Sequence, residues 1–174
     1  DGLQWLGIKW DEGPFLQSDR LDSYEKYLKQ LLKDGKAFFC QHSEKELEEE
    51  RKKQLANKAV LMHKCDEFRE KFLDRGIIRF KNDAKEILPF QDDIRGQIAF
   101  SPALLGDFSL AKDLRTPLYN FAVVIDDEEM AISHVIRGED HIANTTKQML
   151  IQEALGFKTP HYAHLPLILD SDRS

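Results

Sequence analysis

Two apolar runs separated by an acidic segment constrain the fold of this chain most. Phe121–Ile125 is continuously apolar, which is typical of a strand buried on both faces. Asp126–Glu129 then predicts a turn, and Ala131–Ile136 predicts a second strand. A helix is expected over Asn144–Leu155 and a last strand over His164–Leu169. Strands that alternate with a helix in this way predict an α/β sheet.

A helix-rich segment precedes these runs. Apolar residues recur at helical spacing over Leu21–Leu32, and Gly35 predicts the left-handed cap that ends this helix. Ala37–Cys40 predicts a short strand. Ser43 and Glu46 form a capping-box pattern, so another helix is expected to begin at Ser43.

The next segment predicts one more helix and then several short strands. Asp66 is the expected cap of that helix, and Gly76 its end. Phe68 and Phe72 are expected to face inward. Between Gly76 and Leu110, short apolar runs alternate with Asp, Gly and Pro, which predicts strands joined by turns.

Composition narrows the class of protein. With 41% hydrophobic and 32% charged residues, the 174-residue chain is typical of a globular, cytoplasmic protein. No apolar run approaches the roughly 20 residues that cross a bilayer, so no membrane partner is expected. The net charge of −6 argues against nucleic-acid binding over the whole surface but leaves room for a local basic patch. The opening sequence DGLQWLGIKW has no Met, which favours a cut piece of a longer protein.

Polar residues gather where the second predicted strand ends, over Arg137–His141. Ligands of α/β sheets usually lie at the carboxyl ends of strands, and an arginine there can hold a carboxylate through two parallel hydrogen bonds. The spacing by itself favours another interpretation, in which Arg137 pairs with a neighbouring acid. The candidate acids are Asp126, Asp127 and Glu139.

The chain contains a mirrored pair of metal-ligand motifs. Cys40 and His42 form C-x-H, and His63 and Cys65 form H-x-C. Thiolates and imidazoles are the preferred structural ligands of zinc, so these residues predict a tetrahedral site. The alternative is four unrelated residues near a helical hairpin. Two cysteines are too few for a disulfide scaffold.

The run TPLYNFAVVIDD…M.ISHVIRGEDH..NT..Q resembles the second half of the catalytic fold of glutamyl-tRNA synthetases, which are class I synthetases. LGIKWDEGP, IIRFK, LGDFSLAKD and ALGFKTPHYAHLPLIL resemble the same family in the same order, so the resemblance covers essentially the whole chain. Glutaminyl relatives share the fold but normally lack VIRGEDH. The resemblance implies part of a Rossmann-like nucleotide-binding catalytic domain with an inserted α+β connecting domain. Its expected boundaries are 1–21 and 115–174 for the catalytic fold and 22–114 for the insertion.

The resemblance also implies roles for single residues. Arg137 matches the arginine that holds the substrate carboxylate, and Tyr119 matches a tyrosine of the glutamate pocket. The positions that match contacts to ATP are Asp140, His141, Leu167 and Ile168. Alternative interpretations are a buried, locally satisfied aromatic for Tyr119 and core packing for Leu167 and Ile168. Thr146 stands where the family usually has Pro, with little expected consequence.

Many relatives have a Cys-rich zinc site in the region of the mirrored motifs. Here His42 takes a place commonly held by Cys, so the resemblance implies a structural zinc ion without fixing its ligands. The inserted segment is expected to contact the acceptor end of tRNA(Glu). Its candidate phosphate-facing residues are Lys26, Lys29, Lys33, Lys36, Arg51, Lys52 and Lys53.

The resemblance implies a monomeric glutamate–tRNA ligase that uses ATP with Mg²⁺ to activate glutamate. The chain contains neither the HIGH-type nor the KMSKS-type motif of class I synthetases, so it is interpreted as an internal fragment that is inactive alone. Two alternatives stay open. One is a shortened paralogue that glutamylates a modified tRNA base, and the other is a non-catalytic α/β binding module.

Overall fold

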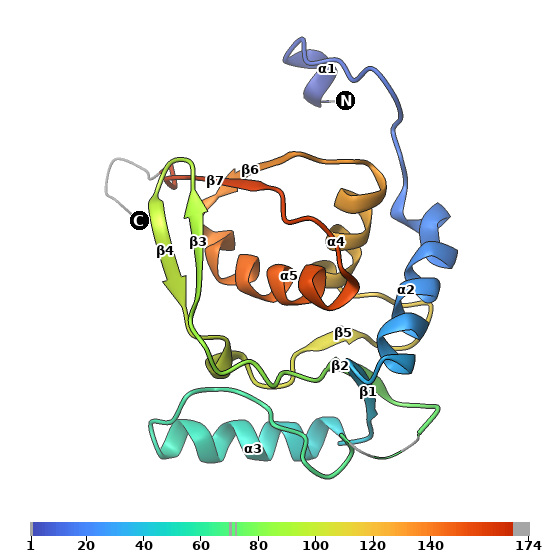
Figure 1. Ribbon diagram of the computed structural model, residues 1–174, viewed down its shortest axis with the longest axis vertical. Helices are drawn as coiled ribbons and strands as arrows, with labels where there is room; N and C mark the ends of the chain where they lie inside the picture. Colours follow the sequence, from blue (N-terminus) through green and yellow to red (C-terminus); the bar gives the residue numbers. More distant parts are fainter. Residues whose placement is uncertain (1, 70, 72, 169–174) are drawn as a thin grey trace.

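The computed structural model describes residues 2–69, 71 and 73–168, and Figure 1 shows their arrangement. Within these residues, no helix is long and apolar enough to span a membrane. The helices and strands are α1 (Gly2–Trp5), η1 (Gln17–Arg20), α2 (Leu21–Lys33), β1 (Ala37–Cys40), α3 (Glu44–Ala56), β2 (Ile77–Phe80), β3 (Leu88–Asp92), β4 (Gly96–Phe100), η2 (Pro102–Leu105), β5 (Ser109–Ala111), α4 (Tyr119–Glu129), β6 (His134–Gly138), η3 (Glu139–His141), α5 (Ile142–Leu155) and β7 (His161–Leu165).

A mixed sheet with the strand order β4-β3-β7-β6 carries the C-terminal part of the chain. β6, α5 and β7 form a β–α–β unit, whose two strands run parallel with His134 opposite His161. The hairpin of β3 and β4 joins this unit, because β3 pairs parallel with β7 at Asp92 and Tyr162. Strands from residues 22–114, which the resemblance predicts as an insertion, therefore share a sheet with strands from residues 115–174.

A second, antiparallel sheet has the order β1-β2-β5. One hydrophobic core joins this sheet to the helices, and it contains Tyr24 of α2, Ile78 of β2, Phe121 of α4 and Ile151 of α5, each 0% exposed. Residues from 22–114 and from 115–174 thus pack in the same core. The domain boundaries drawn from the family resemblance remain a proposal.

The N-terminal segment extends from this core. Residues 2–19 are all exposed, and α1 and the chain after it lead away from the rest of the molecule (Figure 1). Trp5 is 86% exposed and Leu6 is 62% exposed, so these two apolar side chains lie largely in solvent.

Several sequence-based predictions are confirmed. The helix expected over Leu21–Leu32 is α2, and the strand expected over Ala37–Cys40 is β1. α3 begins with the predicted capping box, in which Ser43 and Glu46 exchange hydrogen bonds between side chain and backbone. The Gly76–Leu110 segment contains the expected short strands.

Other predictions are wrong. The run Phe121–Ile125 lies in helix α4, which also includes the acidic residues predicted as a turn. A short, continuously apolar run fits a buried helix as well as a buried strand, and α4 buries Phe121 and Ile125 in the shared core. The second strand begins only at His134. The last strand, expected over His164–Leu169, runs from His161 to Leu165, and residues 166–168 lie outside it. Residue 169 lies outside the described residues.

The helix expected after Asp66 is also absent from the described residues. Residues 66–69 form turns, and the expected inward-facing residue Phe72 lies outside the described residues. Phe68 is half-buried and packs against Cys40 and Cys65. A local cap pattern therefore did not extend into a helix, because this short segment packs around the cysteines.

Candidate substrate site and metal centre

Arg137 lies near the carboxyl end of β6, where its guanidinium group is held by neutral acceptors. Nη2 donates to Thr145 Oγ1 at 2.7 Å and to Gln148 Oε1 at 2.9 Å, both on α5. Nε donates to Nε2 of His164 at 3.1 Å. The guanidinium carbon lies 5.4 Å from the ring centre of Tyr162. These contacts fix the side chain. They involve only Nε and Nη2, and Nη1 has no hydrogen-bond partner among the described residues.

Two of the three candidate acids near Arg137 bind other arginines. Asp126 accepts a hydrogen bond from Arg20 at 2.7 Å, and Glu139 accepts one from Arg95. None of the described carboxylates forms an ion pair with Arg137. The interpretation favoured by spacing alone is therefore wrong, because tertiary packing supplies these acids with different cations.

The charge of Arg137 affects the pKa of Asp127, although the two side chains form no ion pair. Burial raises the pKa of this carboxyl group to about 6, and the negative charge of Asp126 acts in the same direction. The positive charge of Arg137 opposes both effects but does not overcome them. Arg137 thus keeps a cationic character that no neighbouring side chain neutralises by direct contact.

A buried Asp–His pair supports Arg137 from behind. Asp92 and His164 are both 0% exposed, and Oδ2 of Asp92 lies 2.6 Å from Nδ1 of His164. Nδ1 donates to the carboxylate and Nε2 accepts from Arg137, so the hydrogen bonds assign a neutral imidazole. Burial acts to raise the pKa of Asp92, but hydrogen bonds from the Arg95 amide, His164 and the Ile94 amide outweigh it and lower the pKa to about 2.

Sequence reasoning missed this pair. Asp92 was interpreted only as part of a turn-rich strand segment, and His164 only as the start of a strand. The two residues are 72 positions apart and come from different predicted domains. A histidine in an otherwise apolar run is a weak signal, and only the β3–β7 pairing brings the acid to it.

Tyr119 lies on the open side of the same region. It begins α4, is 50% exposed, and its ring centre lies 5.8 Å from that of His141. The next residue, Asn120, accepts a hydrogen bond from Gln148 at 3.1 Å, which links the start of α4 to a residue that also binds Arg137. The alternative of a buried aromatic is therefore wrong for Tyr119.

The residues matched to ATP contacts lie at the carboxyl ends of β6 and β7. Asp140 and His141 follow β6, and Oδ2 of Asp140 lies 3.6 Å from Nε2 of His141. Leu167 is 50% exposed and Ile168 is fully exposed, so core packing does not explain either residue. The Leu167 amide donates to Glu139 Oε1 at 3.0 Å, which draws the chain after β7 toward η3.

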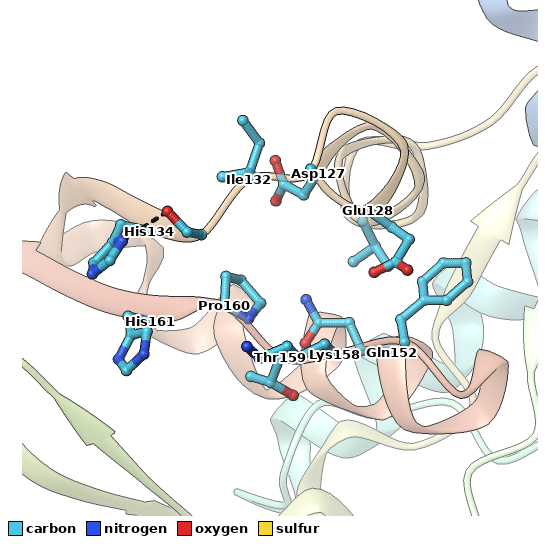
Figure 2. A pocket seen from close by; sticks show the side chains of 13 residues that line it. Asp127, Glu128, Ile132, His134, Gln152, Lys158, Thr159, Pro160 and His161 are labelled. Carbon is cyan, nitrogen blue, oxygen red and sulfur yellow. Dashed lines mark hydrogen bonds between the residues drawn. The ribbon is translucent and has the colours of Figure 1, made fainter.

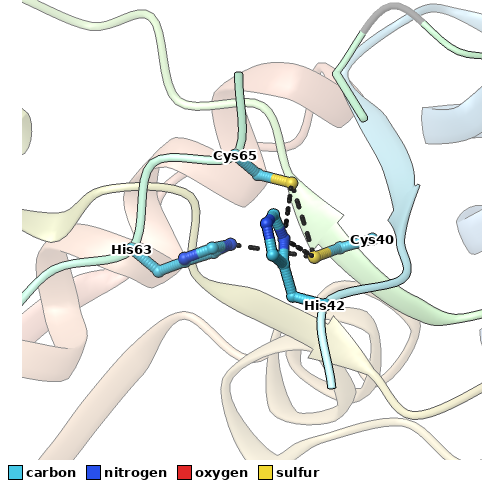
Figure 3. Close-up of side chains that lie close together, drawn as sticks. All are labelled: Cys40, His42, His63 and Cys65. Atoms are coloured by element: carbon cyan, nitrogen blue, oxygen red, sulfur yellow. Dashed lines mark hydrogen bonds between the residues drawn. The ribbon is translucent and has the colours of Figure 1, made fainter. Parts of the chain in front are cut away.

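The mirrored Cys and His motifs converge on one point (Figure 3). Sγ of Cys40 lies 3.4 Å from Sγ of Cys65, 3.3 Å from Nδ1 of His42 and 3.7 Å from Nε2 of His63. Cys65 Sγ lies 3.5 Å from His42 Nδ1. Zinc–sulfur and zinc–nitrogen bonds of ordinary length place tetrahedral ligand atoms about 3.3–3.8 Å apart. The four residues therefore fit a zinc ion, and the alternative of four unrelated residues is wrong.

The surroundings of the cluster favour metal binding as well. Nδ1 of His63 lies 2.6 Å from Glu50 Oε2, so Nε2 faces the cysteines. Carboxylates commonly orient metal-binding histidines in this way. Burial acts to raise the pKa of Cys40, but hydrogen bonds from His63 and His42 outweigh it and lower the pKa to about 6. A thiol that ionises readily is a good metal ligand.

The fold and the site together define an α/β protein whose candidate binding residues lie at the carboxyl ends of parallel strands, as in Rossmann-like catalytic domains. Residues 1–174 match the profile of the family described as tRNA synthetases class I (E and Q), catalytic domain. The chain belongs to this family.

Similar proteins agree on one activity. The chain is 46% identical to a glutamate–tRNA ligase of Carboxydothermus hydrogenoformans and covers 40% of that protein. It is 47% identical to one of Trichormus variabilis and covers 38% of it. A crystal structure of a glutamate tRNA ligase from Elizabethkingia meningosepticum, in complex with its amino acid, superposes with a TM-score of 0.85 at 32% identity, over 96% of this chain and 38% of that one. The chain thus spans about 40% of the length of these relatives.

Proposed function

We propose that this chain supplies the glutamate-binding part of a glutamate–tRNA ligase. The complete enzyme joins glutamate to ATP with Mg²⁺, releases pyrophosphate, and transfers the glutamyl group to the terminal adenosine of tRNA(Glu). The observation that carries this proposal is Arg137, a fixed guanidinium with no direct carboxylate partner among the described residues. A ligand carboxylate supplies the missing countercharge, and the half-exposed Tyr119 forms a wall beside it.

The activation step needs little covalent chemistry from the protein. Arg137 and Tyr119 orient glutamate, while Asp140, His141, Leu167 and Ile168 face ATP from the ends of β6 and β7. Positioning brings the α-carboxylate of glutamate to the α-phosphate of ATP, and this accounts for most of the rate gain in such reactions. The isolated chain is expected not to activate glutamate, because it lacks the motifs that stabilise the phosphate charge.

The acceptor end of tRNA is the proposed macromolecular partner, and a soluble cytoplasmic monomer is the proposed state. The candidate basic residues on α2 and α3 are all exposed. Lys29 pairs with Glu25 at 2.6 Å and Lys52 with Glu48 at 3.8 Å, so these two cations are partly neutralised within their own helices. We expect weak, salt-sensitive binding of tRNA. Binding that stays undetectable in a gel shift at low salt contradicts it.

The glutamate-dependent exchange of pyrophosphate into ATP tests the proposed activity in the complete enzyme that contains this chain. Arg137→Lys removes the planar, two-pronged donor but keeps the charge, so the KM for glutamate should rise at least about tenfold. Arg115→Lys is the matched control, because Arg115 is an exposed surface residue that pairs with Asp22 and Glu25. An unchanged KM in Arg137→Lys, or an enzyme without glutamate-dependent exchange, overturns the proposal.

The same enzyme separates the two competing functions. Transfer of glutamate to a modified base, with the terminal adenosine left free, supports the shortened paralogue. A protein that binds neither glutamate nor ATP in calorimetry supports the non-catalytic module.

We also propose that Cys40, His42, His63 and Cys65 hold a structural zinc ion. Their ligand atoms already have tetrahedral spacings, so zinc binding needs little rearrangement. Metal analysis of protein purified without a His-tag or chelator should find one equivalent of zinc. Cobalt substitution should give thiolate-to-cobalt charge-transfer absorption, which Cys65→Ser weakens. Glu49→Gln is the control, because Glu49 lines the same hollow as His42 and His63 but is outside the ligand set. Protein without bound metal contradicts the proposal.

A further inference from the structure

We infer that Asp93, His134 and His161 form a second divalent metal site, suited to Zn²⁺, where β6 and β7 begin and β3 ends. The strand register brings the two histidines together. His134 begins β6 and His161 begins β7, and the two residues are direct cross-strand partners. Their rings stack with centres 4.9 Å apart and planes 18° apart. Figure 2 shows the two imidazoles side by side at one end of a cavity.

Asp93 approaches the histidine pair from the other side of β7. Its backbone amide donates to the carbonyl of Tyr162 at 2.8 Å, which fixes the residue where β3 meets β7. One ligand atom from each of Asp93, His134 and His161 lies within 4.8 Å of the others. Two neighbouring strands and the turn after β3 thus bring one carboxylate and two imidazoles within reach of one metal ion.

The donor set selects the class of metal. Two imidazoles with one carboxylate suit Zn²⁺ and its neighbours in the transition series, whereas Ca²⁺ and Mg²⁺ prefer oxygen ligands alone. Nδ1 of His134 lies 2.9 Å from Ser133 Oγ, an outer contact that leaves Nε2 to bind a metal. All three ligands are exposed, so rotation of their side chains can bring the ligand atoms the roughly 1 Å closer that tetrahedral spacing requires. Water completes the coordination.

The site is separate from the proposed substrate site. Arg137 lies toward the carboxyl end of β6, whereas His134 lies at its amino end. A cavity of about 390 Å³ opens beside the histidines and includes Asp127 and Gln152 in its wall. Gln152 is 2% exposed and its Oε1 has no hydrogen-bond partner among the described residues. The cavity therefore has room for water bound to the metal.

Metal binding at this point has a structural consequence. β3 and β7 share a single registered pair, Asp92 with Tyr162, so the hairpin of β3 and β4 has a narrow attachment to the parallel strands. Asp93 lies on that hairpin, and a metal shared with His134 and His161 adds a second attachment. Zinc should therefore slow hydrogen exchange in the hairpin more than in α2.

Calorimetry with Zn²⁺ tests the site in the 174-residue chain after one equivalent of zinc has been added. A further equivalent should bind, and His134→Ala or His161→Ala should weaken it at least about tenfold, since loss of an outer-shell partner alone costs that much. Asp93→Asn should also weaken it. Glu128→Gln is the control, because Glu128 lines the same cavity outside the ligand set.

Histidine-detected NMR provides a second readout that does not depend on the variants. Zinc should shift the imidazole nitrogens of His134 and His161 together, and should leave those of the buried His164 in place. A wild-type chain that binds no further equivalent overturns the inference. So does a second equivalent that survives in the double histidine variant or that leaves both imidazoles unshifted.

Discussion

Replacing Asp92 by Asn tests how the fold supports Arg137. The Asn side chain is nearly the same size, so it keeps the packing and can still accept from the Ile94 and Arg95 amides. Its NH₂ group takes the place of Oδ2 and cannot accept the hydrogen bond from Nδ1 of His164, which lies 2.6 Å from that oxygen in the native protein. His164 must then present Nε2–H to the Nε–H of Arg137, which places two donors against each other.

The size of the effect follows from the pKa of Asp92. Its ordinary value is 3.8 and its value in the folded protein is about 2, which corresponds to about 2 to 3 kcal/mol of stability at roughly 1.4 kcal/mol per pKa unit. Because the folded-state pKa is lowered, this stability is fully present above about pH 4. It is lost as the pH falls toward 2. The donor conflict adds to the loss, so Asp92→Asn should lower the free energy of unfolding by about 3 kcal/mol at pH 7.

Urea unfolding followed by circular dichroism measures this difference at a series of pH values. The gap between wild type and Asp92→Asn should shrink between pH 4 and pH 2, because the wild type loses the ionised carboxylate there. Asp93→Asn, measured in EDTA, is the matched control and should change stability by less than about 0.5 kcal/mol, since this neighbour is exposed. A gap below about 1 kcal/mol at pH 7, or one that does not change with pH, refutes the reasoning.

Three further predictions concern local structure. A Cβ at Gly76 would lie 2.4 Å from a backbone carbonyl of β1 at a φ of +118°, whereas Gly96 has a φ of +74° and open space. Gly76→Ala should therefore cost about 3 kcal/mol in thermal unfolding and Gly96→Ala about 1 kcal/mol, and equal losses would contradict the steric argument. Ser43→Ala removes the capping box of α3 and should cost about 1 kcal/mol in urea unfolding, with no loss if water replaces the cap. Burial, followed by the hydrogen bond to Asp126, raises the pKa of Tyr24 to about 12. An absorbance titration should show a tyrosine that ionises only near that pH and disappears in Tyr24→Phe, and ordinary ionisation of every tyrosine would rule this out.

The sequence predicted elements best where local chemistry decides the structure. The helical spacing of α2 and the capping box of α3 depend on residues within a few positions of each other, and both were confirmed. The strand predicted over Phe121–Ile125 was wrong, because a continuously apolar run shows neither the helical nor the strand spacing of apolar residues. Asp66 failed as a helix cap because the next residues pack beside the cysteine cluster.

For the candidate site, the sequence by itself determined which residues are candidates. The resemblance selected Arg137 and Tyr119, and the mirrored spacing selected the Cys and His residues of the proposed zinc site, because residue types and short spacings are visible in a linear chain. Only the tertiary structure decided which charges meet. In the tertiary structure Asp126 pairs with Arg20, Glu139 pairs with Arg95, and a neutral His164 accepts a hydrogen bond from Arg137. These contacts form because the fold brings together residues that are far apart in the sequence. Arg137 has no carboxylate partner among the described residues because packing pairs the nearby acids Asp126 and Glu139 with other arginines.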